Sequence, residues 1–197
     1  ILFMFAMLGV VLSDNLIQLW FFWELTSISS FLLISFWGHK TEARKGARMA
    51  LTVTGAGGLA LLAGLLILGN TGGSFSLTDV LDNGDLIKAS SNSPIIVVLV
   101  LLGAFTKAAQ FPFHFWLPGA MQAPTPVSSY LHSATMVKAG FFLLILLNPV
   151  LGGTVEWSYI IPLFGVLTML VGSYFAITQT DLTGFLAYTT LDRKRCV

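Results

Sequence analysis

The sequence predicts an all-α protein, a polytopic transmembrane helix bundle. Of its 197 residues, 55% are hydrophobic and only 10% are charged, and the mean hydropathy is +0.84, which lies outside the range of soluble domains. The apolar residues are gathered in runs of about 20, the length that a helix needs to cross a hydrocarbon core about 30 Å thick. A net charge of only +1 argues against nucleic acid as a partner and leaves the lipid bilayer as the expected surroundings.

Five apolar stretches are expected to cross the membrane completely, with a partial helix at each end of the chain. The full spans are 15–37, 48–69, 94–116, 125–147 and 157–178, and the partial helices are 1–12 and 180–191. Residues 70–93 are rich in Gly, Ser and Asp and are expected to form the only long loop. Residues 1–191 would then be a single transmembrane domain, incomplete at both ends, because Ile1 lies in mid-helix and the chain is interpreted as a piece of a longer protein.

Positively charged residues collect on one side of this predicted domain. The segment 38–48 and the tail 179–197 together carry seven of them: Lys40, Arg44, Lys45, Arg48, Arg193, Lys194 and Arg195. The opposite side carries Lys88 alone. Because cytoplasmic loops hold the excess of Lys and Arg, the loop 38–48 and the C-terminal tail are predicted to be cytoplasmic, in a multi-pass protein of the cell membrane.

Three charged side chains remain deep inside the predicted spans, Glu24, Lys107 and Lys138, and the histidine His132 joins them as a candidate. Glu24 lies about 14 Å of helical rise into its span, Lys107 lies about 20 Å from the start of its span, and Lys138 lies about half way along its helix. These depths are beyond the reach of snorkelling. Since a charge in hydrocarbon costs between about 2.5 and 17 kcal/mol by different scales, we expect these residues to form a proton or ion relay.

Glu24 and Lys107 allow two interpretations. They could form a buried ion pair that fixes helix packing, or a proton relay in which neutralising one partner changes the charge of the other. A buried pair is a poor source of stability, because desolvation can exceed the Coulombic gain. Burial also favours the neutral form of both groups, so both could exchange protons near neutral pH. We therefore favour the relay.

The helix that carries Lys107 is expected to be discontinuous. Pro112 removes a backbone donor and clashes with the carbonyl of residue 108, and Pro118 follows six residues later. Broken backbone at membrane depth persists where it is buried in protein or lines water, so helix breaks at Pro112 and Pro118 would give Lys107 a hydrated neighbour. The alternative is an ordinary proline kink followed by an interfacial loop.

His132 lies on a stripe of small and polar residues in the next span. Ser128, His132, Thr135 and Ala139 share one helix face, and Lys138 lies roughly 120° around the helix from His132. Hydroxyls on both sides of the imidazole favour a proton-carrying chain. The alternative is a hydrogen-bonded histidine that serves helix packing.

Other patterns do not indicate a catalytic, cofactor-binding or metal site. Cys196 is the only cysteine, which excludes an internal disulfide and a zinc or iron–sulfur ligand set. Gly55, Gly57 and Ala60 match the spacing of a dinucleotide site, but they lie in an apolar span without a preceding strand. Close packing of these small residues against a neighbouring helix is expected instead. No cofactor is expected.

Three contiguous blocks resemble a known family of membrane proteins. They are W-E-L-T-S-I-S-S-F-L-L-I at 23–34, G-A-F-T-K-A-A-Q-F-P-F-H-F-W-L-P at 103–118 and A-P-T-P-V-S-S-Y-L-H-S-A-T-M-V-K-A-G at 123–140. They resemble the proton-conducting antiporter module shared by Mrp-type multisubunit Na⁺/H⁺ antiporters and the antiporter-like subunits of respiratory complex I. The resemblance is closest to the large subunit of the Mrp antiporters, and it covers the chain up to about residue 191.

The resemblance implies roles for the ionisable residues inside the membrane. Glu24 and Lys107 match the charge pair that drives the module, and His132 matches a link in its lateral proton path. Lys138 matches a lysine whose presence favours the Mrp antiporters over complex I. The family implies that a change in the separation of Glu24 and Lys107 alters the proton affinity of the lysine, which couples inward proton movement to outward Na⁺ movement.

The resemblance therefore implies a fragment of a cation/proton antiporter subunit that provides a proton half-channel for Na⁺/H⁺ exchange. Other subunits of a hetero-oligomeric complex would be its partners, and the chain would be a transporter subunit rather than an enzyme. Two alternatives stay open: a proton-pumping membrane subunit of complex I, and a non-functional truncated remnant. The chain departs from the family at Gly119, where an acidic residue is usual, and at 192–197, interpreted as an aberrant or truncated tail.

Overall fold

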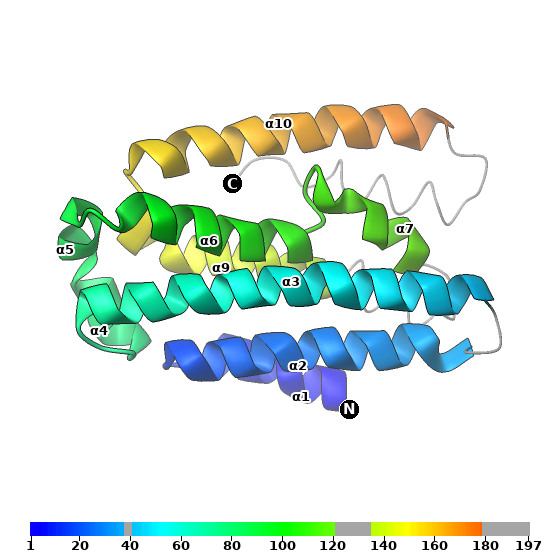
Figure 1. The fold of residues 1–197 in the computed structure, drawn as a ribbon, viewed down its shortest axis with the longest axis horizontal. Coiled ribbons are helices and arrows are strands. Elements are labelled where there is room, and N and C mark those ends of the chain that lie inside the picture. The colour runs from blue at the N-terminus through cyan, green and yellow to red at the C-terminus, as the bar shows by residue number, and fades with distance from the viewer. Residues whose placement is uncertain (38–40, 121–134, 179–197) are drawn as a thin grey trace.

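The structure, a computed structural model, describes residues 1–37, 41–120 and 135–178, and this part of the chain is helical without a strand (Figure 1). The longer helices are α1 (Leu2–Leu12), α2 (Leu16–Ile34), α3 (Thr41–Gly72), α6 (Ser93–Lys107), α9 (Met136–Leu151) and α10 (Val155–Thr178). The short segments are η1 (Ser35–Trp37), α4 (Leu77–Asp82), α5 (Gly84–Ala89), η2 (Phe113–Phe115) and α7 (Trp116–Ala120). The predicted all-α transmembrane bundle is confirmed.

Three of the described helices are long and apolar enough to cross a membrane. They are α2, residues Ala43–Gly72 of α3, and residues Val155–Ile177 of α10. α1, α6 and α9 are apolar but shorter. The predicted span 48–69 was therefore too short, and the predicted span 94–116 was too long because α6 ends at Lys107. The predicted partial helix 180–191 lies outside the described residues.

Local signals explain where α2 and α6 begin. The side chain of Asn15 accepts hydrogen bonds from the backbone N–H groups of Ile17 at 2.9 Å and Gln18 at 3.4 Å, and so caps α2. α6 has Pro94 in its first turn. Backbone N–H groups in the first turn of a helix have no intrahelical acceptor, so a proline there costs no hydrogen bond. Both helices therefore start at residues whose side chains favour a helix N-terminus.

The segment 70–93 is not the long loop that its composition predicted. α3 extends to Gly72, and α4 and α5 follow, because Leu77, Val80 and Ile87 are buried and anchor these short helices to the core. The backbone N–H of Leu77 donates to the carbonyl of Asp14 at 2.7 Å, which joins this segment to the start of α2. The turn before α2 and the segment 70–93 therefore lie at the same end of the bundle, as the predicted alternation of spans requires. That the opposite end, with the loop 38–48, is cytoplasmic stays a prediction.

α3 is the central helix of the described bundle. α2 packs on one side of it and α6 on the other, while α1 lies against α2 and α9 lies against α6 (Figure 1). Glycines allow the closest approaches: a Cβ atom on Gly103 of α6 would lie 2.6 Å from Cβ of Leu61 on α3, and one on Gly140 of α9 would lie 2.7 Å from the carbonyl oxygen of Ala104 on α6. α6 is thus held tightly between α3 and α9, and its last residue is fixed in the interior.

Candidate functional site

Lys107 is the last residue of α6, and its side chain is completely buried. The C-terminal end of a helix carries partial negative charge, which favours a cation there. The ammonium crosses to α2, where Nζ donates to the carbonyl oxygen of Trp23 at 2.6 Å, to the hydroxyl of Thr26 and to the hydroxyl of Ser27 at 3.3 Å. Nζ also lies 4.3 Å from the centre of the Trp23 ring, in position for a cation–π interaction.

These three acceptors on α2, the carbonyl of Trp23 and the hydroxyls of Thr26 and Ser27, form what we call the α2 cradle. A lysine ammonium has three N–H donors, so the cradle supplies one acceptor for each donor. The Thr26 hydroxyl itself donates to the Trp23 carbonyl at 2.7 Å, and the Ser27 hydroxyl does so at 3.4 Å. The cradle therefore satisfies a fully buried ammonium with neutral groups alone.

Glu24 lies beside the cradle but faces α3. Its carboxylate contacts the backbone at Gly58, where any Cβ atom would overlap Oε1. The indole N–H of Trp20 donates to the Gly58 carbonyl at 2.9 Å, which ties α2 to α3 at this level. Within the described residues, Oε1 of Glu24 is buried without a hydrogen-bond partner. Such a buried acceptor is costly, so it marks a place where a donor or a proton would bind favourably.

Glu24 and Lys107 lie at the junction of α2, α3 and α6 without forming a direct ion pair. Their oxygen and nitrogen atoms do not approach within 4.0 Å in the described structure, although the two charges attract one another through space. The structure thus brings both side chains to one helix junction. Lys107 contacts neutral acceptors on α2, and the carboxylate of Glu24 lies against Gly58 of α3. Their action as a relay stays a prediction.

The chain after Lys107 is irregular, and side chains from later elements satisfy its backbone. Ala109 adopts the left-handed φ of +52°, which ends the helix before Pro112. The indole N–H of Trp116 donates to the carbonyl of Thr106 at 2.9 Å, and the N–H of Phe111 donates to the hydroxyl of Thr168 on α10 at 2.9 Å. These contacts compensate for the backbone bonds that the interrupted helix cannot make.

The two predicted helix-breaking prolines occupy different surroundings. Pro112 lies between α6 and η2, five residues beyond the last residue of α6. Pro118 lies in the first turn of α7, a position that tolerates proline, so no break occurs there. The helix break is therefore earlier than the prolines alone predicted, directly beside Lys107.

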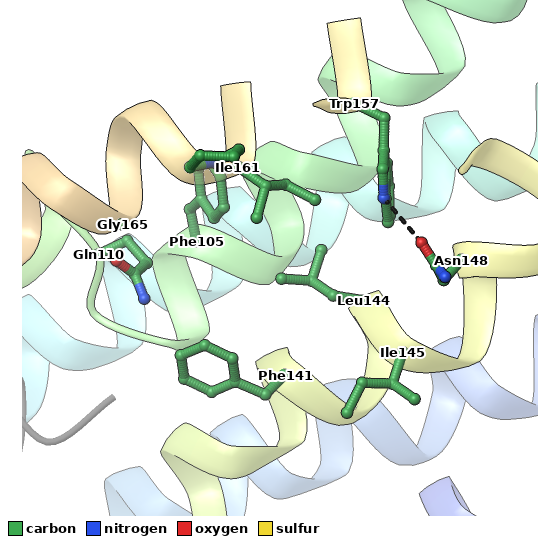
Figure 2. Close-up of a pocket in the computed structure, with 10 residues that line it drawn as sticks. Phe105, Gln110, Phe141, Leu144, Ile145, Asn148, Trp157, Ile161 and Gly165 are labelled. Carbon is green, nitrogen blue, oxygen red and sulfur yellow. Dashed lines mark hydrogen bonds between the residues drawn. The ribbon is translucent and has the colours of Figure 1, made fainter. Parts of the chain in front are cut away.

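A cavity of about 210 Å³ lies between α6, α9 and α10, on the side of α6 away from α2 (Figure 2). Its walls are mostly apolar, with Gln110 at one end and Asn148 at the other (Figure 2). Asn148 accepts a hydrogen bond from the indole of Trp157 at 3.1 Å, and Oε1 of Gln110 is buried without a partner among the described residues. Sequence reasoning missed both polar residues. Asn148 stands alone in an apolar run, and that signal could have found it, whereas Gln110 follows Lys107 by three residues and the lysine drew attention first.

The other two predicted relay residues are not joined to this junction by the described contacts. His132 lies outside the described residues. Lys138 is exposed on α9 and lines a groove of about 200 Å³ with Met7, Val10 and Val11 of α1. In the part of the chain that the structure describes, Lys138 has no hydrogen-bond or ion-pair partner. Its role as a relay residue stays a prediction.

Comparison with known proteins identifies the family. The family described as NADH:quinone oxidoreductase/Mrp antiporter, transmembrane, matches residues 13–193, nearly the whole chain. The chain belongs to this family. The Mrp antiporter family match confirms the resemblance that the motifs around Glu24, Lys107 and His132 indicated, and with its apolar helices it makes this a multi-pass membrane protein.

Three known proteins are similar to this chain over almost all of its length. A probable K⁺/H⁺ antiporter subunit of Rhizobium meliloti is 62% identical over 96% of the chain, and a Na⁺/H⁺ antiporter subunit of Alkalihalophilus pseudofirmus is 53% identical over 98%. One protein chain in the solved structure of the Mrp complex from Dietzia sp. DQ12-45-1b superposes over 98% of the chain with a TM-score of 0.92 and 39% identity. The chain spans only 19%, 24% and 21% of the lengths of these three proteins, respectively.

Proposed function

We propose that this chain, as part of an Mrp-type antiporter subunit, provides a proton half-channel for exchange of a monovalent cation against protons. The observation that carries the proposal is the fully buried ammonium of Lys107, held at the end of an interrupted helix beside Glu24. An ionisable group at this depth is a functional candidate in any membrane protein. The names of the relatives support antiport as the function.

In the proposed mechanism Lys107 carries the proton and Glu24 controls how firmly it is held. An ionised Glu24 stabilises the ammonium through the low-dielectric interior, whereas a protonated Glu24 removes that attraction and favours release. His132 and Lys138 would continue the path laterally. Other subunits of a hetero-oligomeric complex would complete it, with the loop 38–48 and the tail on the cytoplasmic side.

The exchanged cation is either Na⁺ or K⁺, because the names of the two curated relatives divide between them. We place the chain in a transporter rather than a redox enzyme on the same names, although the family also includes subunits of NADH:quinone oxidoreductases. Measuring exchange with each cation separately tests the assignment.

The deciding experiment replaces Lys107 by alanine in the full-length subunit, within the assembled complex, in everted membrane vesicles. Cation-dependent dissipation of a pH gradient should be abolished with Na⁺ and with K⁺, while the amount of assembled complex is retained. Lys88→Ala is the matched control, because Lys88 lies in the segment 70–93, far from the α2 cradle in the sequence, and its ammonium lies 4.0 Å from the exposed carboxylate of Asp85. Normal exchange by the Lys107→Ala complex would contradict the proposal.

A further inference from the structure

We infer that Thr26 and Ser27 are positioning residues for the proton carrier: with the Trp23 carbonyl they form the place on α2 that holds Lys107 while it is separated from the carboxylate of Glu24. The inference rests on the proposed function, because it assigns the position that holds the proton-carrying lysine apart from Glu24. The structure shows the cradle position, with Nζ at 2.6 Å from the Trp23 carbonyl and 3.3 Å from the Ser27 hydroxyl.

The cradle can lose the lysine without leaving its own polar groups unsatisfied. The hydroxyls of Thr26 and Ser27 both donate to the carbonyl of Trp23, four residues or fewer earlier in the same helix. When the ammonium departs, each hydroxyl therefore keeps a partner and the carbonyl keeps a donor. An unsatisfied buried group is the usual penalty for breaking such a contact, and here that penalty is absent.

The Glu24 position offers the opposite situation, an acceptor that has no donor. Oε1 of Glu24 is buried, and within the described residues nothing donates to it. Ser27 is three residues beyond Glu24, which is about 4.5 Å of helical rise. The flexible four-carbon side chain of Lys107 can cover such a distance by changing rotamers, with no movement of either helix.

The two positions differ in how strongly they hold a proton. Neutral hydroxyl and carbonyl oxygens stabilise an ammonium less than a carboxylate does, because hydrogen bonds between two charged groups are the stronger kind. The cradle is therefore the position from which Lys107 releases its proton, and the Glu24 position is the one in which it retains it. By moving between the two positions, the side chain of Lys107 would bind a proton beside Glu24 and release it from the cradle.

The test removes the cradle hydroxyls in the full-length subunit of the assembled complex. Thr26→Val keeps the shape of the side chain and deletes its hydroxyl, and Ser27→Ala is the milder second variant. The loss of a hydrogen bond to a charged group should shift the balance between the two positions by about tenfold, so we expect the maximal exchange rate to fall by about tenfold in Thr26→Val. The apparent KM for the cation should not change, and Thr26→Ser should restore most of the rate.

Ser29→Ala is the matched control, because Ser29 is also a buried hydroxyl of α2 but donates to the Thr26 carbonyl, at 3.1 Å, and does not touch Lys107. It should keep the full exchange rate, and an equal loss in Ser29→Ala would overturn the inference. If Thr26→Val fails to assemble, Ser27→Ala decides. Unchanged maximal rates in the assembled cradle variants would overturn the positioning role of Thr26 and Ser27 alone, whereas normal exchange by Lys107→Ala would overturn the proposed function with it.

Discussion

Replacing Gly57 by alanine should push the last turn of α6 away from α3. A Cβ atom on Gly57 would overlap the hydroxyl of Thr106 and lie 2.7 Å from the Cβ of Thr106. The hydroxyl can rotate, but the Cβ of Thr106 is fixed to the backbone. The 2.7 Å separation must therefore open to the 3.4 Å of an ordinary contact, an outward movement of about 0.7 Å.

The expected cost follows from two opposing effects. Overpacking of a close helix contact destabilises by about 1–3 kcal/mol. Alanine is the better helix former and returns up to about 1 kcal/mol. The net effect is a less stable complex, and because Thr106 precedes Lys107 directly, the displaced turn should also lower the exchange rate in vesicles.

Gly55→Ala provides the comparison on the same helix. A Cβ atom there would have nothing within 4 Å, so only the gain in helix propensity of up to about 1 kcal/mol remains. The unfolding temperature of the purified complex should fall for Gly57→Ala and stay level or rise for Gly55→Ala, with exchange reduced only in the former. Equal unfolding temperatures and equal rates in the two complexes would refute the argument from close approach.

Two further predictions concern contacts that order the site. Asn15→Ala removes the side-chain cap of α2 and should destabilise the complex by about 1 kcal/mol in thermal unfolding. Asn92→Ala is its control and should have no effect, because the Asn92 side chain makes no capping hydrogen bond at the start of α6. Thr168→Val leaves the N–H of Phe111 without its partner, at a cost of about 1–3 kcal/mol, and hydrogen exchange at Phe111 should become faster. Thr52→Val, an exposed threonine on α3, should leave that exchange unchanged, and the same acceleration in both would contradict the assigned contact.

The buried charges were predictable from the sequence because charge inside an apolar run is a strong signal. Lys107 and Glu24 stand out for that reason, and the structure puts them at one helix junction. Their immediate contacts were not predictable. Hydroxyls in membrane helices usually donate to a carbonyl of their own helix, as Thr26 and Ser27 also do. The sequence around Thr26 and Ser27 does not indicate that their hydroxyls also accept hydrogen bonds from a lysine on α6.

Helix boundaries were predicted less well, for identifiable reasons. The apolar run continues past Lys107, and the residue that ends α6 by taking a left-handed conformation is Ala109, which carries no sequence signal for it. Close packing was predicted for Gly55, Gly57 and Ala60 from their small size alone. Of the two glycines, Gly57 confirms it, whereas Gly55 has no neighbouring atom within 4 Å of a Cβ position. The helices in 70–93 were not predicted because the Gly, Ser and Asp content of this segment is typical of a loop. Leu77 and Val80 nevertheless have the three-residue spacing of a buried helix face.

The end of α6 at Lys107 makes the length of this helix part of the site. α6 has 15 residues, so its rise of about 22 Å sets the depth of the ammonium, and its rotational phase aims the side chain at α2. One residue inserted or deleted between Ser93 and Lys107 would turn the lysine by about 100° around the axis, away from every acceptor on α2. Apolar residues along α6 can be exchanged for one another without altering that direction, whereas a single-codon insertion or deletion in the gene would alter it at once.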